Sequence, residues 1–397
     1  MSDYPAWLSI YKRIVAESQP SDLYLEYNRW VFTEMLCLCY SFNSVRKELS
    51  NLTNEQLTQL EKEYNHIKKL LTTEINNKIP DFIRAAKSGD AEYISTRIDE
   101  EAKKRDIYGM TALMWAARAG HAKCVELLIE AEAGEHDDAG ETALTWAARC
   151  GQIECVKLLV DKEARLQNKY GVTALISAAM NNRCNTVKLL IDKEAGMRNH
   201  NGMTALMYAA NRGHAKCVKI LVKREAREVD NERLSKEVGL QNKYGETALM
   251  NAAEFNATQM MKFLIPREIH MEDNNGMTAL MHAAFHGSEE SVKLLIPHEV
   301  GMRDNDGMTA LMHAARGWQP DCAELLIPHE VGMRDNDGMT ALMWIQELDH
   351  SREVYELLLP HEINIKDNEG RTVVEHLKGG YKEELLELIE SLGLRVE

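Results

Sequence analysis

The sequence of 397 residues lacks the features that mark secreted and membrane-spanning proteins. Its N-terminus reads MSDYPAWLSIYKR, which has no basic flank leading into an apolar run and so does not resemble a signal peptide. No stretch of about 18 uninterrupted apolar residues, the length needed to cross a bilayer, occurs anywhere. We therefore expect a soluble, cytoplasmic protein without membrane insertion.

Cysteine is present but lacks the spacing of a metal or redox motif. The chain has eight cysteines and no C-x-x-C pair. Four of them, Cys124, Cys155, Cys217 and Cys322, each stand fifteen residues after a glycine of a recurring motif described below. This regular placement predicts small buried helix residues rather than a redox role.

Signatures of catalysis are also missing. The chain contains no G-x-x-x-x-G-K-[ST], G-x-S-x-G, G-x-G-x-x-G or H-R-D motif. His-Glu pairs at His298, His329 and His361 lack the second histidine of an H-E-x-x-H zinc site, and we interpret them as copies of a repeated loop. The sequence thus predicts a protein that is not an enzyme and has no catalytic residues, cofactor or metal site.

Positive charge is in deficit. The formal net charge is -15, of which residues 1–80 contribute -1 and residues 81–397 contribute -14. Such a surface repels phosphate groups, which argues against nucleic acid and anionic membranes as partners and favours proteins with basic surfaces. With 45% hydrophobic and 27% charged residues, the chain has the composition of an ordinary folded protein.

The most informative feature of the sequence is an internal repeat. The phrase G-x-T-A-L recurs eight times, and a weaker G-R-T-V-V follows. Successive glycines are 31 residues apart, except for one interval of 43 and a last interval of 32. A fixed period of this size predicts a solenoid, in which each unit buries its apolar face against its neighbours. The glycines are Gly109, Gly140, Gly171, Gly202, Gly245, Gly276, Gly307, Gly338 and Gly370.

Each unit can be interpreted from its own residues. Asp or Asn stands three residues before every glycine, as Asp106 does before Gly109, and this pattern is typical of a tight turn. Thr two residues after the glycine, such as Thr111, is placed to cap a helix. That helix carries Leu followed by Ala-Ala, and after a break comes a second amphipathic run. The unit is therefore predicted to be a turn, a helix, a short loop and a helix.

The full pattern, D-x-x-G-x-T-A-L-x-x-A-A-x-x-G-H-x-x-x-V-x-L-L, is similar to the ankyrin repeat over residues 81–397. The resemblance implies an all-α ankyrin-repeat solenoid of about nine to ten helix-turn-helix units with short turns. The Met-rich T-A-L-M style resembles the expanded ankyrin families of parasitic flagellate protists. Met commonly replaces the usual His of T-P-L-H, which removes a polar link within the turn.

Three segments depart from the repeat. Residues 1–80 have helical patterning, and we expect a small helical unit that caps the first repeat, with homo-oligomerisation or partner docking as alternatives. Residues 225–236 form an insertion of alternating charge, expected to be a solvated extension, with a docking site as the alternative. Residues 367–397 are predicted to be a polar C-terminal capping repeat.

The resemblance implies that partners bind on a concave surface formed by turn tips and first helices. Aromatic and arginine side chains there are candidate contacts, because these residue types are enriched at interface hot spots. For Trp115 and Trp146 the alternative is packing between neighbouring helices, and Arg118 and Arg149 could form a small basic ridge. Candidates at the tips are Tyr108, Lys169, Tyr170, Lys243, Tyr244, Asp306 and Asp337, and on the first helices Trp115, Arg118, Trp146, Arg149, Tyr208, Arg212, Phe255, Phe285 and Trp344.

These observations favour a non-catalytic protein-interaction scaffold or adaptor. One alternative is a cytoskeleton-associated structural or elastic spacer, because each unit of a solenoid contacts only its neighbours. Another is a regulatory subunit that acts through residues 1–80. Because one scaffold serves many partners, the fold alone does not identify the ligand.

Overall fold

The structure is a computed structural model that describes residues 62, 65, 66, 69, 79–223, 237–345, 352–376 and 380–395. Every regular element in these residues is a helix, in agreement with the all-α prediction. The chain divides into two compact units, Met1–Ala143 and Leu144–Glu397. Most of the N-terminal region 1–80 and the insertion 225–236 lie outside the described residues, so the predictions for them remain predictions.

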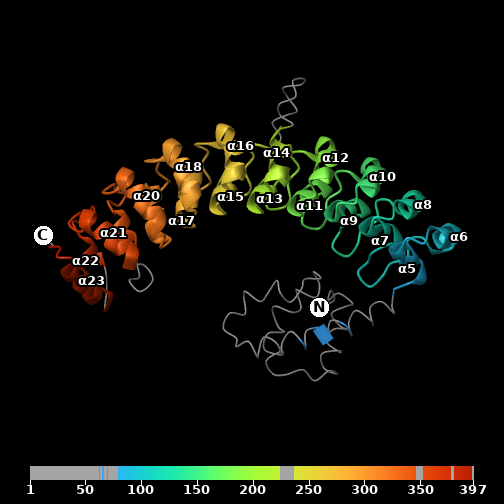
Figure 1. Cartoon of the computed structure of the whole chain (residues 1–397), viewed down its shortest axis with the longest axis horizontal. Helices are drawn as coiled ribbons and strands as arrows, with labels where there is room; N and C mark the ends of the chain where they lie inside the picture. Colours follow the sequence, from blue (N-terminus) through green and yellow to red (C-terminus); the bar gives the residue numbers. More distant parts are fainter. Residues whose placement is uncertain are drawn as a thin grey trace. The chain divides into compact units, whose positions relative to one another are not determined.

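Helices follow one another in pairs, a first helix and a second helix in each repeat (Figure 1). The first unit contains the pairs α5 (Asp81–Ser88) with α6 (Ala91–Glu101) and α7 (Ala112–Ala119) with α8 (Ala122–Glu132). Helix α9 (Ala143–Cys150) begins at the last residue of that unit. The further elements are α10 (Ile153–Glu163), α11 (Ala174–Met180), α12 (Cys184–Glu194), α13 (Ala205–Asn211), α14 (Ala215–Lys223), α15 (Ala248–Glu254), α16 (Thr258–Glu268), α17 (Ala279–Phe285), α18 (Glu289–Glu299), α19 (Ala310–Arg316), α20 (Pro320–Glu330), the 3₁₀ helix η4 (Ala341–Trp344), α21 (Arg352–Glu362), α22 (Val373–His376) and α23 (Gly380–Ser391).

Within the second unit, successive first helices pack side by side, as do successive second helices. Helices α11, α13, α15, α17, α19 and η4 form one row, and α12, α14, α16, α18, α20 and α21 form the other. The alanine pair of each α-helix in the first of these rows, such as Ala283 and Ala284, is fully buried, whereas η4 has no such pair. Because alanine has only a methyl side chain, neighbouring first helices can approach closely.

The predicted turn is present before each first helix from α7 onward. Asn168 illustrates it: Oδ1 accepts hydrogen bonds from the amides of Tyr170 and Val172, both at 2.9 Å. Gly171 has a φ of +77°, a conformation that glycine adopts without steric cost. Thr173 follows in extended conformation, and its hydroxyl accepts from the amide of Ile176 at the start of α11.

A buried glutamate in each of these repeats was not predicted. Glu194 ends α12 at 1% exposure. Its Oε2 accepts from the amide of Leu175 in the first helix of the same repeat (2.7 Å), and Oε1 accepts from the amide of Arg165 in the preceding loop (3.0 Å). The carboxylate thus accepts a hydrogen bond from an amide in the first turn of a helix, which has no partner within that helix. It also joins adjacent repeats. Glutamates at this position are Glu132, Glu163, Glu194, Glu237, Glu268, Glu299, Glu330 and Glu362.

One earlier interpretation changes because of this glutamate. The His-Glu pairs do not lie in a loop, since they end helices α18, α20 and α21 with an exposed histidine and a buried glutamate. Glu237, which follows the insertion, accepts from the amides of Gly196 (2.7 Å) and Leu206 (3.1 Å). The chain after the insertion therefore regains the register of the repeat.

The periodic cysteines are buried as predicted, but one of them is not a free thiol. Cys124, Cys155 and Cys322 are no more than 1% exposed. Cys217 forms a disulfide with Cys184, which joins α14 to α12 across a Cα–Cα distance of 5.0 Å. The prediction of buried helix residues holds for all four cysteines, and the disulfide of Cys217, which was not predicted, forms because stacking brings two second helices within disulfide reach.

Candidate partner-binding surface

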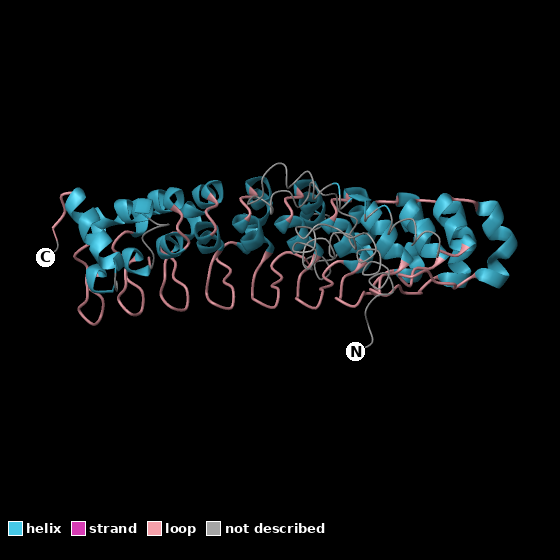
Figure 2. Cartoon of the chain, turned by 90° about the horizontal axis from the view of Figure 1, so that it is seen from below, coloured by secondary structure: helices cyan, strands magenta, loops and turns pink. Residues whose placement is uncertain are grey.

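The turns of the second unit form a continuous row of tips, visible as projecting loops in Figure 2. Each tip donates a backbone hydrogen bond to the carbonyl of the preceding tip. The amide of His200 donates to Tyr170, that of Lys243 to Asn201, and that of Asn274 to Tyr244, each at 3.0 Å. These bonds fix the spacing of the tips, and we call this edge the tip row, residues 169–170, 200–201, 243–244, 274–275, 305–306, 336–337 and 368–369.

The N-terminal half of the tip row is aromatic and cationic. Tyr170 is 67% exposed and Tyr244 is 55% exposed, and both lie beside an exposed lysine. The Nζ atom of Lys243 lies 4.7 Å from the centre of the Tyr244 ring and donates to Oδ1 of Asn201 (2.8 Å). A tyrosine on a fixed turn offers a large contact area with little conformational entropy to lose on binding.

The C-terminal half is acidic and has its own side-chain ladder. Asp306, Asp337 and Glu369 are exposed at the tips. Beside them, Nδ2 of Asn305 donates to the carbonyl of Asn274 (3.2 Å), and Asn336 and Asn368 repeat the bond to the tips before them. The charge of the tip row therefore changes sign along its length.

Among the first-helix candidates of this unit, only some present their side chains to solvent. Phe255, at the C-terminal end of α15, is 52% exposed, and Arg212 is also exposed. Phe285 is half-buried with its ring centre 5.2 Å from that of His286. Tyr208 is half-buried, and its hydroxyl accepts from Nδ2 of Asn199 at 2.9 Å.

Two tryptophan candidates each lie beside an arginine candidate of the same helix, whereas Trp344 lies 5.7 Å from the guanidinium of Arg316 in α19. Trp115 is 8% exposed, so packing, the alternative interpretation, describes it better than partner contact. The guanidinium of Arg118 lies 4.9 Å from the Trp115 ring, and that of Arg149 lies 4.6 Å from the Trp146 ring. Tyr108, Arg118, Trp146 and Arg149 are half-buried.

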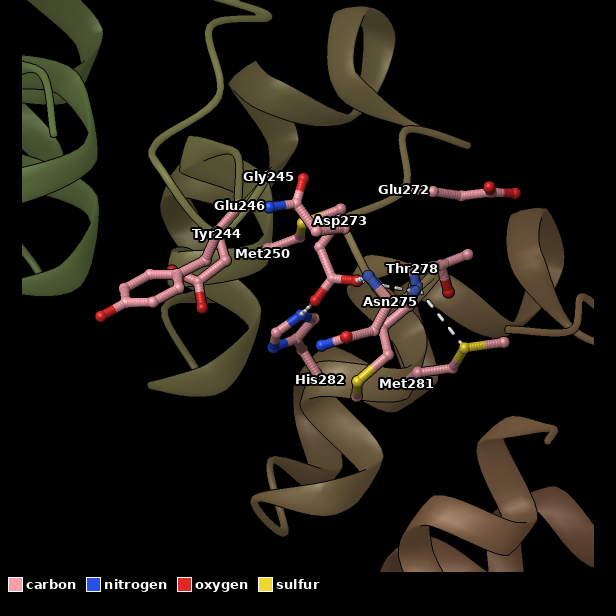
Figure 3. Close-up of polar contacts among 12 residues, drawn as sticks. Tyr244, Gly245, Glu246, Met250, Glu272, Asp273, Asn275, Thr278, Met281 and His282 are labelled. Atoms are coloured by element: carbon pink, nitrogen blue, oxygen red, sulfur yellow. Dashed lines mark hydrogen bonds and ion pairs between the residues drawn. The ribbon is translucent and has the colours of Figure 1, made fainter. Parts of the chain in front are cut away.

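The residue before Ala-Ala makes a polar contact with the turn, and this contact was not predicted. Nε1 of Trp115 donates to Oδ2 of Asp106 (2.8 Å), and Nε2 of His282 lies 3.1 Å from Oδ2 of Asp273 (Figure 3). Where Met replaces the usual His of T-P-L-H, the turn loses a polar link. The residue one position after that Met supplies a polar link instead. Asp304 with His313, Asp335 with Trp344, and Asp367 with His376 are paired in the same way.

These pairs shift the pKa of the aspartates in different directions. Burial raises the pKa of Asp106, and the hydrogen bonds from Trp115 and two amides do not offset it. Burial acts in the same direction on Asp304, but the bonds from His313 and the turn amides outweigh it and lower the pKa. At Asp106 the negative charge of Asp138 adds to the effect of burial, whereas at Asp304 the electrostatic attraction of His313 adds to the hydrogen bonds that lower the pKa.

One group of potential metal ligands occurs among the described residues, consisting of Glu254, His282 and His286. The sequence signal that identifies it is the pair His282 and His286, which are four residues apart without the glutamate of an H-E-x-x-H motif. None of the helices in the described part of the chain combines the length and apolarity needed to cross a membrane.

Comparison with known proteins agrees with the helix pairs. A family model described as "Ankyrin repeats (3 copies)" matches residues 63–169, 161–233, 229–303 and 286–369. The search of curated proteins finds no significant match. The matched segments span most of the chain and coincide with the repeated helix pairs, and the chain therefore belongs to the ankyrin-repeat family.

Proposed function

We propose that the protein is a non-catalytic, cytoplasmic scaffold or adaptor that binds other proteins along the tip row and first helices of its second unit. The observation that supports this most strongly is the exposure of Tyr170 and Tyr244 on turns that backbone bonds hold in place. Phe255 adds an exposed aromatic ring on a first helix whose other apolar residues are buried. Exposed aromatic rings on a rigid frame are typical anchors of a protein interface.

The acidic half of the tip row supports a partner with basic residues. Asp306, Asp337 and Glu369 project from successive tips, and the chain as a whole has a net charge of -15. Charges at the rim of an interface mainly steer association and select partners. A partner that bears an apolar segment followed by a basic one would match both halves of the tip row.

Affinity capture from the native extract tests this proposal. The full chain is compared with a variant that carries Tyr170→Ala, Tyr244→Ala and Phe255→Ala. A control variant carries Leu386→Ala and Leu392→Ala, because both leucines are 41% exposed on or beside α23. We expect the aromatic variant to lose specific partners that the control retains, with matching circular dichroism. Equal capture by all three chains would reject the proposed surface.

A cytoskeletal spacer is the second candidate. Residues 297–312 and 328–343 are identical, and bonds between successive tips link each repeat of the second unit to the next. A uniform, neighbour-linked array suits an elastic element. This function would be favoured over the adaptor if the wild type co-sediments with assembled cytoskeletal polymers and the aromatic variant co-sediments to the same extent.

A further inference from the structure

The group formed by Glu254, His282 and His286 joins two adjacent repeats of the second unit. Glu254 is the last residue of α15, His282 lies within α17, and His286 directly follows α17. One ligand atom from each residue lies within 4.8 Å of the others. His282 and His286 are four residues apart, so their side chains project from the same side of the helix.

His282 is held in one tautomer. Its Nε2 lies 3.1 Å from Oδ2 of Asp273, while Oδ1 of Asp273 accepts from the amides of Asn275 and Met277 (Figure 3). A carboxylate only accepts, so Nε2 bears a proton, and in the neutral ring Nδ1 then carries the lone pair. A histidine that donates one ring nitrogen to a carboxylate and keeps the other for an ion is the usual arrangement at metal sites.

His286 is oriented in a complementary way. Its Nδ1 lies 3.0 Å from the carbonyl oxygen of His282, which can only accept, so Nδ1 bears a proton. In the neutral ring the Nε2 lone pair then faces Oε1 of Glu254 at 3.5 Å. Two acceptors that face each other at this distance need a proton or a cation between them.

We propose that Glu254, His282 and His286 bind one zinc ion or a similar divalent transition metal across the contact between α15 and α17. Two imidazole nitrogens and one carboxylate oxygen, with a fourth position open to water, form a ligand set that zinc accepts in proteins. His282 is buried and held by Asp273, whereas Glu254 is half-buried and His286 is exposed. The two outer side chains can therefore move inward to the bond lengths of about 2 Å that zinc requires.

The neighbouring repeats lack this combination of residues. One repeat further on, Phe285 stands at the position of Glu254, His313 at that of His282 and Gly317 at that of His286. The site is therefore specific to one repeat junction among the described residues. Bound metal would add a cross-link between two first helices and stabilise the array at this point, because an ion that binds only the folded state shifts unfolding by mass action.

Zinc titration of the metal-stripped full chain tests the proposal. We expect the wild type to bind one more zinc ion than His286→Ala or Glu254→Ala, or to bind it at least about tenfold more tightly, since even outer-shell partners of zinc ligands contribute about 10- to 100-fold. His329→Ala, which removes an exposed histidine elsewhere, is the control and should bind as the wild type does. Zinc should raise the melting temperature of the wild type and the control, but not of the two ligand variants.

Asp273→Asn provides a test that leaves all three ligands in place. Asparagine occupies the equivalent turn position at Asn199 and Asn242, so the turn should form. Its Nδ2 would donate to Nε2 of His282, move the proton to Nδ1 and weaken zinc binding. Equal zinc stoichiometry and affinity in the wild type, His286→Ala and Glu254→Ala would overturn the proposal. The contact between His286 and Glu254 would then be an ion pair with a protonated His286.

Discussion

Glu330 accepts a 2.7 Å hydrogen bond from the amide of Leu311, nineteen residues earlier, through a carboxylate that is 1% exposed. Its other oxygen accepts from the amide of Gly301 in the loop before that repeat at 2.8 Å. One side chain thus joins the end of a second helix, the start of a first helix and the preceding repeat. The same arrangement recurs along the array, so the repeats are joined by buried polar contacts as well as by apolar packing.

Replacing this glutamate should destabilise the array. Glu330→Ala leaves the amides of Gly301 and Leu311 buried without an acceptor, at about 1–3 kcal/mol each. We expect the free energy of unfolding to fall by about 2–6 kcal/mol, measured by urea denaturation with circular dichroism. Glu324→Ala, an exposed site in the same helix, should stay within about 0.5 kcal/mol of the wild type. Equal denaturation midpoints for the two variants would contradict the assigned role of Glu330.

The paired aspartates predict a specific pH dependence. The pKa of Asp304 lies below its ordinary value of 3.8 in the folded chain, so its ionised form stabilises the fold. This contribution is fully present above the unfolded pKa and is lost as the pH falls through the folded pKa. Asp304→Asn keeps an oxygen for the amides of Asp306 and Met308 and removes the ionisation.

The stability advantage of the wild type over Asp304→Asn should therefore be constant above about pH 5 and should shrink below pH 3.8. Denaturation midpoints measured across this range provide the check. An advantage that grows as the medium becomes more acidic would show that the sign of the pKa shift is wrong.

Two glycines with the same backbone angle allow the cost of backbone strain to be measured apart from the cost of steric contact. Gly276 and Gly301 both have a φ of +81°, which costs about 1–2 kcal/mol for a residue with a Cβ. A Cβ on Gly276 would lie 2.7 Å from the backbone nitrogen of Asn305 in the next tip, whereas one on Gly301 would meet no atom within 4 Å.

Gly276→Ala should accordingly lower the free energy of unfolding by more than Gly301→Ala does, since it also disturbs the bond between two tips. Chemical denaturation of both variants side by side measures the difference. If Gly301→Ala proves as costly as Gly276→Ala, close contact between the tips does not explain the glycine in the repeated motif.

The repeat period, the turns, the threonines at the helix starts and the buried alanines could be predicted because each depends on residues close together in the sequence. The predicted cap hydrogen bond forms at Thr173 but not at Thr111. The role of Glu194 could not be predicted, because glutamate is usually exposed and Arg165, whose amide it binds, lies 29 residues away. The pairing of Cys184 with Cys217 likewise depends on which helices stack.

The candidate surface was predictable in part. The tip position favoured exposure of Tyr170 and Tyr244, and both are exposed. Trp115 has the residue type of an interface anchor, yet a hydrogen bond to Asp106 and close packing hold it inside. Residue type alone does not distinguish these two environments, because both favour a large ring with a polar edge.

The affinity of a captured partner for four versions of the full chain tests the central claim that the tip row binds protein. These are the wild type, Tyr170→Ala with Tyr244→Ala, a variant with Asp306→Asn, Asp337→Asn and Glu369→Gln, and the control with Leu386→Ala and Leu392→Ala. We expect the tyrosine variant to bind at least about tenfold more weakly, a loss of about 1.4 kcal/mol. The affinity of the charge variant should no longer depend on salt concentration. The control should bind the partner with the affinity and salt dependence of the wild type. Equal affinity and equal salt dependence across all four chains would contradict binding at the tip row.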